Sequence, residues 1–535
     1  MSNRSSSTVA AAATSSVMQH IAQGNALLRQ GKVDDAIAVV GGLLQTYPDE
    51  ARVFAFLAEA SRVKGELDAA VSWIDRAIRA SPDPQHKIKK AWLLSRLLRR
   101  DEILPLADQV AAQAGDDRTL RWQLGKLYYH HNFLREAIGQ YEVALATGPD
   151  NPSWRYDLAI ARFYAGDADK AEADLNSVLQ ASPQAGAVIY LRSTLRRQCQ
   201  GQNHVADIES RLRSPFRTAE DEAGALYALA KELEDLGEHE KAFISLLAGA
   251  KKKRSTIQYD AAAFDKMTEE VRAVQSVSAM AVPVAGHDGE GAIFVLGLPR
   301  TGTTLVERIL LQSGKVKDAG ELMDFGFHLT AAIQRTRAKA PELSPTEATM
   351  KVDFDALGRD YMRGARQMAG GSERFIDKLP ANYLYCGMIH KALPKAKIIH
   401  LVRDPLDSCY AIFKTLFFNA YDFSYDLEEL AAYYIAYRRM MQHWREAMPG
   451  VILDVRYEDL VADTEAQARR IYDWCGLEWT PEALSVPDSK AVFATASAAQ
   501  VREPVHTRSV NSSRKHVDGL APLIKKLEEA GFLEA

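Results

Sequence analysis

The sequence predicts two kinds of fold in one chain: an all-α superhelix of stacked helix pairs, followed by an α/β domain with a parallel sheet. Prolines and alanines recur with a 34-residue period in the first part of the chain. A Pro- and Gly-rich stretch, VPVAGHDGEG, lies at 282–291, and short apolar runs alternate with helical stretches after it. A fixed period is typical of stacked helical repeats, whereas alternating strands and helices favour a parallel sheet.

The repeat period appears in two independent sets of residues. One set is Pro48, Pro82, Pro149 and Pro183, and the other is Ala36, Ala70, Ala137 and Ala171. Successive members of each set lie 34, 67 and 34 residues apart, so one repeat within the middle gap is degenerate. Small alanines allow helices to approach closely, and each proline ends a helix. Residues 124–149 carry Leu-Gly, Tyr, Ala, Tyr and Pro at matching offsets. Residues 20–250 therefore resemble tetratricopeptide repeats, whose concave face binds a peptide or another protein.

Length and composition limit the other possibilities. A chain of 535 residues predicts two to four domains. We expect a disordered tail over 1–16, the repeat array over 17–250, a helical linker over 251–290 and the α/β domain over 291–535. The net charge of −4 provides no basic field for nucleic acid. The four cysteines form no C-x-x-C pair, so neither a metal site nor a disulfide framework is expected.

No apolar run reaches the length of a membrane span, and the Ser- and Ala-rich start lacks the apolar region of a signal peptide. The sequence therefore predicts a soluble, cytoplasmic protein.

The stretch GLPRTGTT at 297–304 has the spacing of a phosphate-binding loop with one changed residue. Gly297, Gly302 and Thr304 hold the expected positions, but Thr303 stands where a nucleotide-hydrolysing loop has its lysine. The apolar run AIFVLG precedes the loop and a helical pattern follows it, which is the context such a loop needs. We therefore predict a phosphate site that does not handle a triphosphate.

Three more strands are expected after the loop, at 374–378, 396–402 and 450–457. Ligands of parallel sheets bind at the carboxyl ends of the strands. Four polar residues follow these strands at their carboxyl ends: Arg300, Lys378, Arg403 and Tyr457. We expect them to line one crevice.

Five segments of the second half together resemble the sulfotransferases. They are GLPRTGTT, DKLPANY, AKIIHLVRDPLDSC, VRYEDLV and TASAAQVREPVHTRSV, and they span most of 291–520. The bacterial type with an N-terminal repeat array is the most similar, and tyrosylprotein sulfotransferase is a more distant relative. The resemblance implies a co-substrate, 3′-phosphoadenosine 5′-phosphosulfate, and transfer of its sulfuryl group to a hydroxyl, for which a protein tyrosine is one candidate.

The resemblance also implies residue roles. The loop residues Arg300, Thr301, Gly302, Thr303 and Thr304 bind the 5′-phosphosulfate, and Arg403 binds the 3′-phosphate. Lys378 supplies a cation to the leaving group with help from Arg300, and Glu321 is the general base. Further donor contacts are expected from Ser408, Tyr457 and Ser497. For Arg403 the alternative is a salt bridge to Asp404 or Asp407, and for Glu321 it is an ordinary carboxylate at a helix N-terminus.

Two residues depart from the family pattern. Ala411 replaces a serine that contacts the 3′-phosphate, and Ser408, one helical turn earlier, is the candidate substitute. Ser513 replaces a tryptophan of the segment that closes over the donor.

Two other functions remain alternatives: a nucleotide kinase or NTPase, against which Thr303 counts, and a non-catalytic repeat scaffold with a decayed transferase domain. All donor motifs lie after residue 290, so the repeats are expected to recruit the acceptor only. That acceptor can be a protein, a sugar, a lipid or a small molecule.

Overall fold

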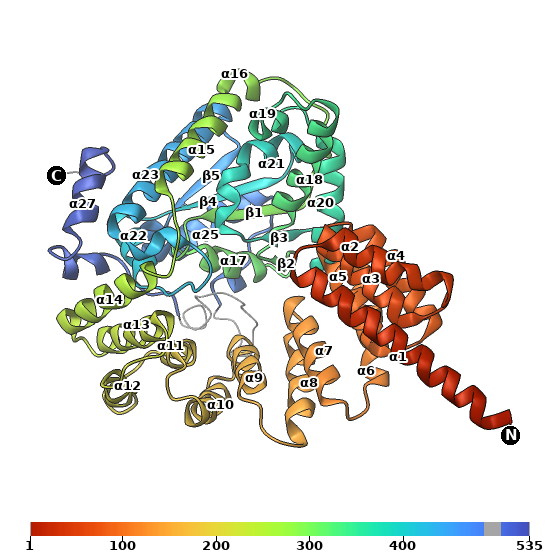
Figure 1. The fold of residues 1–535 in the computed structure, drawn as a ribbon. Coiled ribbons are helices and arrows are strands. Elements are labelled where there is room, and N and C mark those ends of the chain that lie inside the picture. The colour runs from red at the N-terminus through yellow and green to blue at the C-terminus, as the bar shows by residue number, and fades with distance from the viewer. Residues whose placement is uncertain (1, 486–503, 534–535) are drawn as a thin grey trace. The chain divides into compact units, whose positions relative to one another are not determined.

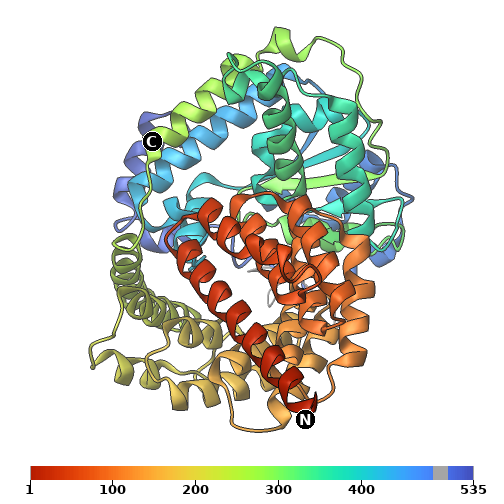
Figure 2. The same cartoon turned by 45° about the vertical axis from the view of Figure 1, so that its right-hand side comes forward.

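Paired helices form the first compact unit of the chain, Met1–Pro149. The computed structural model describes residues 2–485 and 504–533. The unit is drawn from red to orange in Figures 1 and 2. Its helices are α1 (Ser2–Arg29), α2 (Val33–Gly41), α3 (Ala51–Lys64), α4 (Leu67–Ala80), α5 (Pro84–Arg96), α6 (Ile103–Gln113), α7 (Arg118–His130) and α8 (Leu134–Ala146).

The periodic small residues lie where these helices pack. Ala36, Ala70 and Ala137 are fully buried on α2, α4 and α8. A Cβ atom on Gly125 would lie 2.6 Å from the ring of Tyr141, so α7 and α8 approach too closely for any larger residue. The pair α5 and α6 fills the gap where the period fails, which accounts for the 67-residue spacing.

Helix α1 covers the segment for which composition predicts a disordered tail. The segment is rich in alanine, which has the highest intrinsic helix propensity.

The second compact unit, Asp150–Ala535, begins with more helix pairs. These are α9 (Pro152–Tyr164), α10 (Ala168–Ala181), α11 (Gly186–Thr194), α12 (Val205–Leu212), α13 (Ala219–Asp235), α14 (His239–Arg254), α15 (Ala261–Val274) and α16 (Val277–Met280). The buried Ala171 on α10 continues the period of the first unit.

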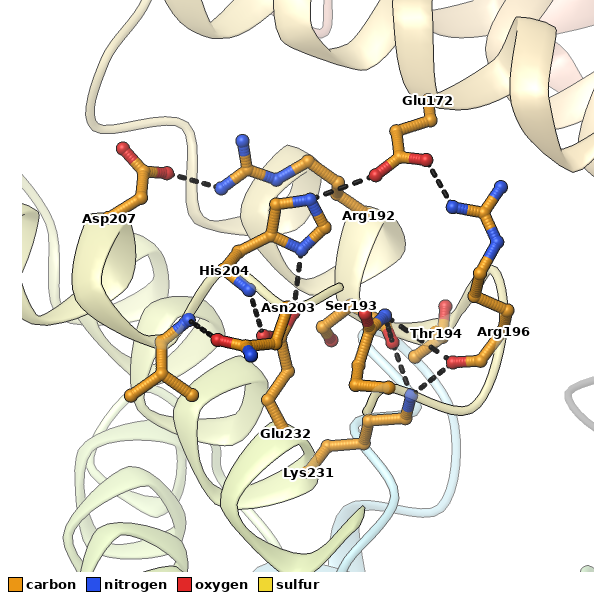
Figure 3. A network of polar contacts seen from close by, with 12 residues as sticks. Glu172, Arg192, Ser193, Thr194, Arg196, Asn203, His204, Asp207, Lys231 and Glu232 are labelled. Atoms are coloured by element: carbon orange, nitrogen blue, oxygen red, sulfur yellow. Dashed lines mark hydrogen bonds and ion pairs between the residues drawn. The ribbon is translucent and has the colours of Figure 1, made fainter. Parts of the chain in front are cut away.

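A network of polar side chains fixes the irregular stretch between α11 and α12 (Figure 3). His204 lies between two carboxyl groups, with Nε2 2.9 Å from Glu172 Oε1 and Nδ1 2.9 Å from Glu232 Oε1. Glu172 also pairs with Arg196, and Arg192 pairs with Asp207. The network satisfies the fully buried carboxyl of Glu232, which would otherwise be costly to bury.

A five-stranded sheet forms the centre of the α/β part, in the order β2-β3-β1-β4-β5 with every neighbouring pair parallel. Its strands are β1 (Ala292–Gly297), β2 (Lys317–Gly320), β3 (Phe375–Asp377), β4 (Lys397–Val402) and β5 (Ile452–Arg456). The all-α repeat array followed by a parallel α/β sheet confirms the fold class that the sequence predicts. The register places Gly297 beside Leu401 and Val402 beside Arg456, so β1, β4 and β5 end at one edge.

Helices cover both faces of this sheet (Figure 1). Alternate side chains of β1 enter two separate cores: Phe294 and Leu296 point to one, Ile293 and Val295 to the other. The second core contains α17 (Thr303–Leu311), α24 (Tyr457–Ala462) and α25 (Thr464–Cys475). The first contains α18 (Asp324–Lys339), α20 (Phe354–Met368), α21 (Cys386–Ala392), α22 (Pro405–Phe413) and α23 (Leu427–Ala447). The described residues also form α19 (Pro345–Thr349) and α27 (Ala521–Glu529).

The repeat helices from α9 onward share their core with the α/β part. Side chains of α9 to α14 belong to the same buried cluster as those of β1 and α23. The Tyr227 hydroxyl donates to the Phe413 carbonyl at 3.1 Å, and the Leu416 amide donates to the Tyr190 hydroxyl at 3.0 Å. Arg254 on α14 makes two 2.7 Å hydrogen bonds to Glu429 on α23. The second compact unit therefore begins at Asp150 and includes both the helices α9 to α14 and the α/β part that follows the Pro- and Gly-rich stretch at 282–291.

This shared core gives a prediction for two shortened chains. A chain beginning at Asp150 is expected to unfold cooperatively, because it keeps the cluster intact. One beginning at Ala281 is expected to aggregate or to melt at a much lower temperature, because it exposes the apolar surface that α9 to α14 cover. Thermal unfolding followed by circular dichroism, with size-exclusion chromatography, tests both. A soluble chain from Ala281 whose Tm matches that of the longer chain would contradict the shared core.

Candidate active site

The loop between β1 and α17 has an unusual backbone. Arg300 has φ 67°, in the left-handed region that few side chains adopt, and Gly302 has φ 105°. A Cβ atom on Gly302 would lie 2.7 Å from Cδ2 of Tyr457, so only glycine fits both the angle and the space. The Thr301 hydroxyl donates to the Leu298 carbonyl at 2.7 Å and closes the turn. Helix α17 starts at Thr303, and its N-cap residue is Gly302, which has no side chain to cap the first turn.

A cavity of about 120 Å³ opens beside this loop. Four basic side chains line it: Arg300, Arg308, Arg403 and Lys414. The described lining residues include no aspartate or glutamate. The backbone around Thr303 and Thr304, at the positive end of α17, contributes another part of the wall. This arrangement suits a ligand with several negative charges.

Arg403 lines the cavity and is buried. Its Nη1 donates to the Arg300 carbonyl at 2.9 Å and its Nη2 to the Ser509 carbonyl at 2.5 Å. Its guanidinium carbon lies 4.8 Å from the centre of the Tyr457 ring. The salt bridge considered as an alternative is present only as a long contact, 4.0 Å from Nη2 to Asp407 Oδ2. Nε is buried without a hydrogen-bond partner among the described atoms, which leaves a donor for a ligand.

Asp407 anchors the C-terminal segment beside the cavity. The backbone amides of Asn511 and Ser513 donate to its carboxylate at 2.6 and 2.9 Å, and the Ser513 hydroxyl donates at 2.7 Å. Ser509 and Ser512 of the same segment line the cavity. Ser513, which departs from the family pattern, is thus a buried hydrogen-bonding residue of this anchor.

The helix α22 places one of its candidate residues in the cavity wall and another outside it. Ala411 lines the cavity, whereas the buried Ser408 donates its hydroxyl to the Arg403 carbonyl at 3.3 Å and is absent from the described lining. Lys414 lines the cavity and pairs with Glu234 of α13 at 2.9 Å. Burial alone would raise the pKa of Glu234, but the Lys414 ammonium outweighs it and lowers the pKa. A repeat helix therefore holds one of the cavity's cations.

Lys378 and Glu321 form an ion pair next to the ends of β2 and β3. The Lys378 side chain is 3% exposed and that of Glu321 is 41% exposed, so the pair has a buried cationic end and an open anionic end. Burial lowers the pKa of Lys378, but the acidic groups around it, including Glu321 with its hydrogen bond, outweigh burial and the net shift is upward. Lys378 therefore remains an ammonium. Neither residue belongs to the described lining of the cavity.

Two buried carboxyl groups adjoin this pair. Asp377 accepts from the Tyr361 hydroxyl at 2.7 Å and from the Leu322 amide at 3.3 Å, and so fixes the turn that carries Glu321. Burial raises the pKa of Asp377 to about 7. Glu307, on the second turn of α17, has Oε2 3.9 Å from Lys378 Nζ. The sequence offers one sign of Glu307, namely a glutamate on an otherwise apolar helix face. For Asp377 it offers only the position directly before Lys378.

Three tyrosines, two of them on repeat helices, interact electrostatically with charged residues of the pair or the loop. Tyr164 on α9 and Tyr421, which has φ 57°, both interact electrostatically with Glu321 and Lys378. Tyr190 on α11 interacts likewise with Arg300. Burial is the main cause that raises the pKa of each of the three phenols.

The structure brings most of the expected site residues together in two neighbouring groups. Arg300, Gly302, Thr303, Thr304, Arg403 and Tyr457 line the cavity, and Thr301 closes the loop beneath it. Ser497 lies outside the described residues. Within the described parts of the chain no group of three or more His, Cys, Asp or Glu side chains could hold a metal ion. No helix there is both long and apolar enough to cross a membrane.

Comparisons with known proteins agree with this geometry. Residues 292–481 match the model of the sulfotransferase family, and residues 21–83 and 91–186 match that of the tetratricopeptide repeat. An uncharacterized protein of Aquifex aeolicus is 26% identical over 96% of this chain and 70% of its own length. Protein-tyrosine sulfotransferase A of Caenorhabditis elegans is 22% identical over 44% of this chain and 66% of its own. Omega-hydroxy-beta-dihydromenaquinone-9 sulfotransferase Stf3 of Mycobacterium bovis is 30% identical, over 28% of this chain and 41% of its own.

Proposed function

We propose that this protein is an enzyme that uses 3′-phosphoadenosine 5′-phosphosulfate as donor. Its residues 292–481 match the sulfotransferase family, and its residues 21–83 and 91–186 match the tetratricopeptide repeat. It transfers the sulfuryl group to a hydroxyl acceptor. The single observation that carries the choice of donor is the cavity, in which four cations and no described carboxylate surround the loop and the start of α17. Such a site matches a ligand with two separate phosphate groups.

The loop and Arg403 bind different parts of the donor. The amides at the start of α17 and the side chains of Thr303 and Thr304 bind the 5′-phosphosulfate. Arg403 binds the 3′-phosphate, with Arg308 and Lys414 as further cations in the same wall. The loop has a threonine at position 303 because this donor has no γ-phosphate for a lysine to reach.

The ion pair performs the transfer. The open carboxylate of Glu321 takes the proton of the acceptor hydroxyl, whose oxygen forms a bond to sulfur. The bond between sulfur and the bridging phosphate oxygen breaks, and its electron pair stays on that oxygen. Lys378, with Arg300, stabilises the charge that develops there. The products are a sulfate ester and 3′-phosphoadenosine 5′-phosphate.

The acceptor approaches from the side of Glu321, which is the exposed end of the pair. Tyr164 of α9 and Tyr421 interact electrostatically with Glu321, which supports an acceptor that contacts the repeats as well as the α/β part. A protein tyrosine is the first candidate to test, because the C. elegans relative is named for that acceptor and tetratricopeptide arrays bind peptides. The mycobacterial relative is named for a different hydroxyl, so the acceptor class must be determined directly.

Isothermal titration calorimetry separates this function from the alternatives. We expect adenosine 3′,5′-bisphosphate to bind more tightly than ADP or ATP with magnesium. Tighter binding of ATP with magnesium would instead support a kinase or NTPase. A protein that binds none of these nucleotides would be the non-catalytic scaffold.

A further inference from the structure

Three carboxyl groups and one ammonium lie together behind the acceptor side of the site. Lys378 pairs with Glu321 and lies 3.9 Å from Oε2 of Glu307. Glu307 in turn interacts with Asp318 of β2 through a hydrogen bond. The proposed mechanism uses Lys378 and Glu321 but assigns nothing to Glu307, although its side chain is only 4% exposed. A buried acid with no role would be a costly feature to keep.

The surroundings of Glu307 determine its charge. Burial is the largest cause that raises its pKa, the negative charges of Asp318 and Glu321 raise it further, and Lys378 opposes them. The net shift of the Glu307 pKa is well upward, which favours the protonated form of this carboxyl group. Its Oε2 has no hydrogen-bond partner among the described atoms. That oxygen faces the Lys378 ammonium as an uncharged acceptor.

An uncharged acceptor at this place is useful during transfer. When Glu321 takes the proton of the acceptor hydroxyl, it loses the charge that holds Lys378. The ammonium must then stay directed at the leaving oxygen, because a displacement of about 1 Å can cost roughly 10²-fold in rate. Glu307 lies on α17, the helix that begins at the phosphate-binding loop, so it ties the ammonium to the element that holds the donor. A second full negative charge there would instead weaken the electrostatic help that Lys378 gives.

We propose that Glu307 is a positioning residue for Lys378, an uncharged carboxyl that holds the ammonium in line with the leaving oxygen while Glu321 exchanges its proton. The proposal rests on the sulfuryl-transfer function described above. It assigns Glu307 no contact with the donor, so its replacement should change kcat and leave donor binding intact.

Two replacements of Glu307 test this. Glu307→Gln keeps an uncharged acceptor of the same shape, whereas Glu307→Leu removes the acceptor. We expect Glu307→Gln to retain most of the parent kcat and Glu307→Leu to lose roughly 10²-fold, with the KM for the donor within about threefold of the parent in both. Glu232→Leu is the matched control: it removes an equally buried carboxyl from the His204 network, away from the cavity lining. It should lower Tm but leave the kcat of the folded protein unchanged.

The dependence of kcat on pH gives a second readout that a purely structural role would not affect. As pH rises, Glu307 loses its proton and becomes a second negative charge beside Lys378. This charge should weaken the help that Lys378 gives to the leaving oxygen, so the parent kcat should fall on the alkaline side. The groups facing Glu307 that also set this charge balance are Asp318, Glu321 and Lys378. Glu307→Gln cannot ionise, so its kcat should stay level to higher pH. This comparison stands even if Glu307→Leu does not fold.

The outcomes separate the two proposals. A parent that binds the nucleotide but transfers no sulfuryl group overturns the proposed function itself. An active parent with Glu307→Leu as fast as Glu307→Gln, or with identical pH profiles for the parent and Glu307→Gln, overturns only the role of Glu307.

Discussion

Glu321→Gln is expected to lower turnover by roughly 10²–10⁴-fold, the usual cost of removing a general base, and to leave donor affinity unchanged. The amide has nearly the shape of the carboxylate but cannot take the acceptor's proton. The site supports this separation of effects, because the described lining of the donor cavity does not include Glu321. Steady-state turnover, with calorimetry of adenosine 3′,5′-bisphosphate, measures both quantities.

The effect of Glu321 must be separated from that of its ion-pair partner. Lys378→Met should also depress turnover, because the leaving oxygen loses its cation. A series of phenols of increasing acidity distinguishes the two, since an acidic phenol needs less help from a base. The Glu321→Gln defect should shrink along the series and the Lys378→Met defect should persist. A Glu321→Gln enzyme as fast as the parent on the least acidic phenol would exclude this residue as the base.

Arg403→Ala is expected to weaken the binding of adenosine 3′,5′-bisphosphate by about 2–5 kcal/mol, the usual cost of truncating one partner of a buried charge pair. The guanidinium lies in the cavity wall and carries a buried Nε without a described partner. It also joins the Arg300 and Ser509 carbonyls, so some loss is expected for every nucleotide. The loss for AMP, which lacks the 3′-phosphate, should be much smaller.

A matched control for Arg403→Ala is Arg445→Ala, which breaks the ion pair of Arg445 with Asp454 on β5. Arg445 is absent from the described cavity lining, so this variant should bind both nucleotides as the parent does. Equal weakening of the two nucleotides by Arg403→Ala would contradict its assignment to the 3′-phosphate.

The sequence predicted those elements of the fold whose local signals agree with their packing. The four expected strands are present, and β1 shows the clearest signal, because its six residues form an apolar run that the parallel sheet buries on both faces. The strand β2 was missed because its four residues, KDAG, lie at the edge of the sheet and form no apolar run. The boundary at Asp150 also had no local signal, because it depends on which core the side chains of α9 to α14 join.

The candidate site divides in a similar way. Motif spacing identified the loop and Arg403, since a phosphate loop and a basic residue after a strand are local patterns. Arg308, which lies four residues after Thr304 on the same helix, could have been found from that spacing. The contributions of Glu307, Asp377 and Tyr164 depend on contacts between distant segments. No pattern within one segment predicts them, and Ser408 failed to reach the cavity for the same reason.

The measurement that tests the central claim most directly is the transfer of a radiolabelled sulfuryl group. The purified protein is incubated with labelled 3′-phosphoadenosine 5′-phosphosulfate and an extract of host cells, with Glu321→Gln in parallel, and the labelled species are identified. We expect the parent to form a labelled sulfate ester and the variant to form roughly 10²–10⁴-fold less. A parent that binds adenosine 3′,5′-bisphosphate yet labels no hydroxyl in the extract or on a phenol would contradict the proposed function.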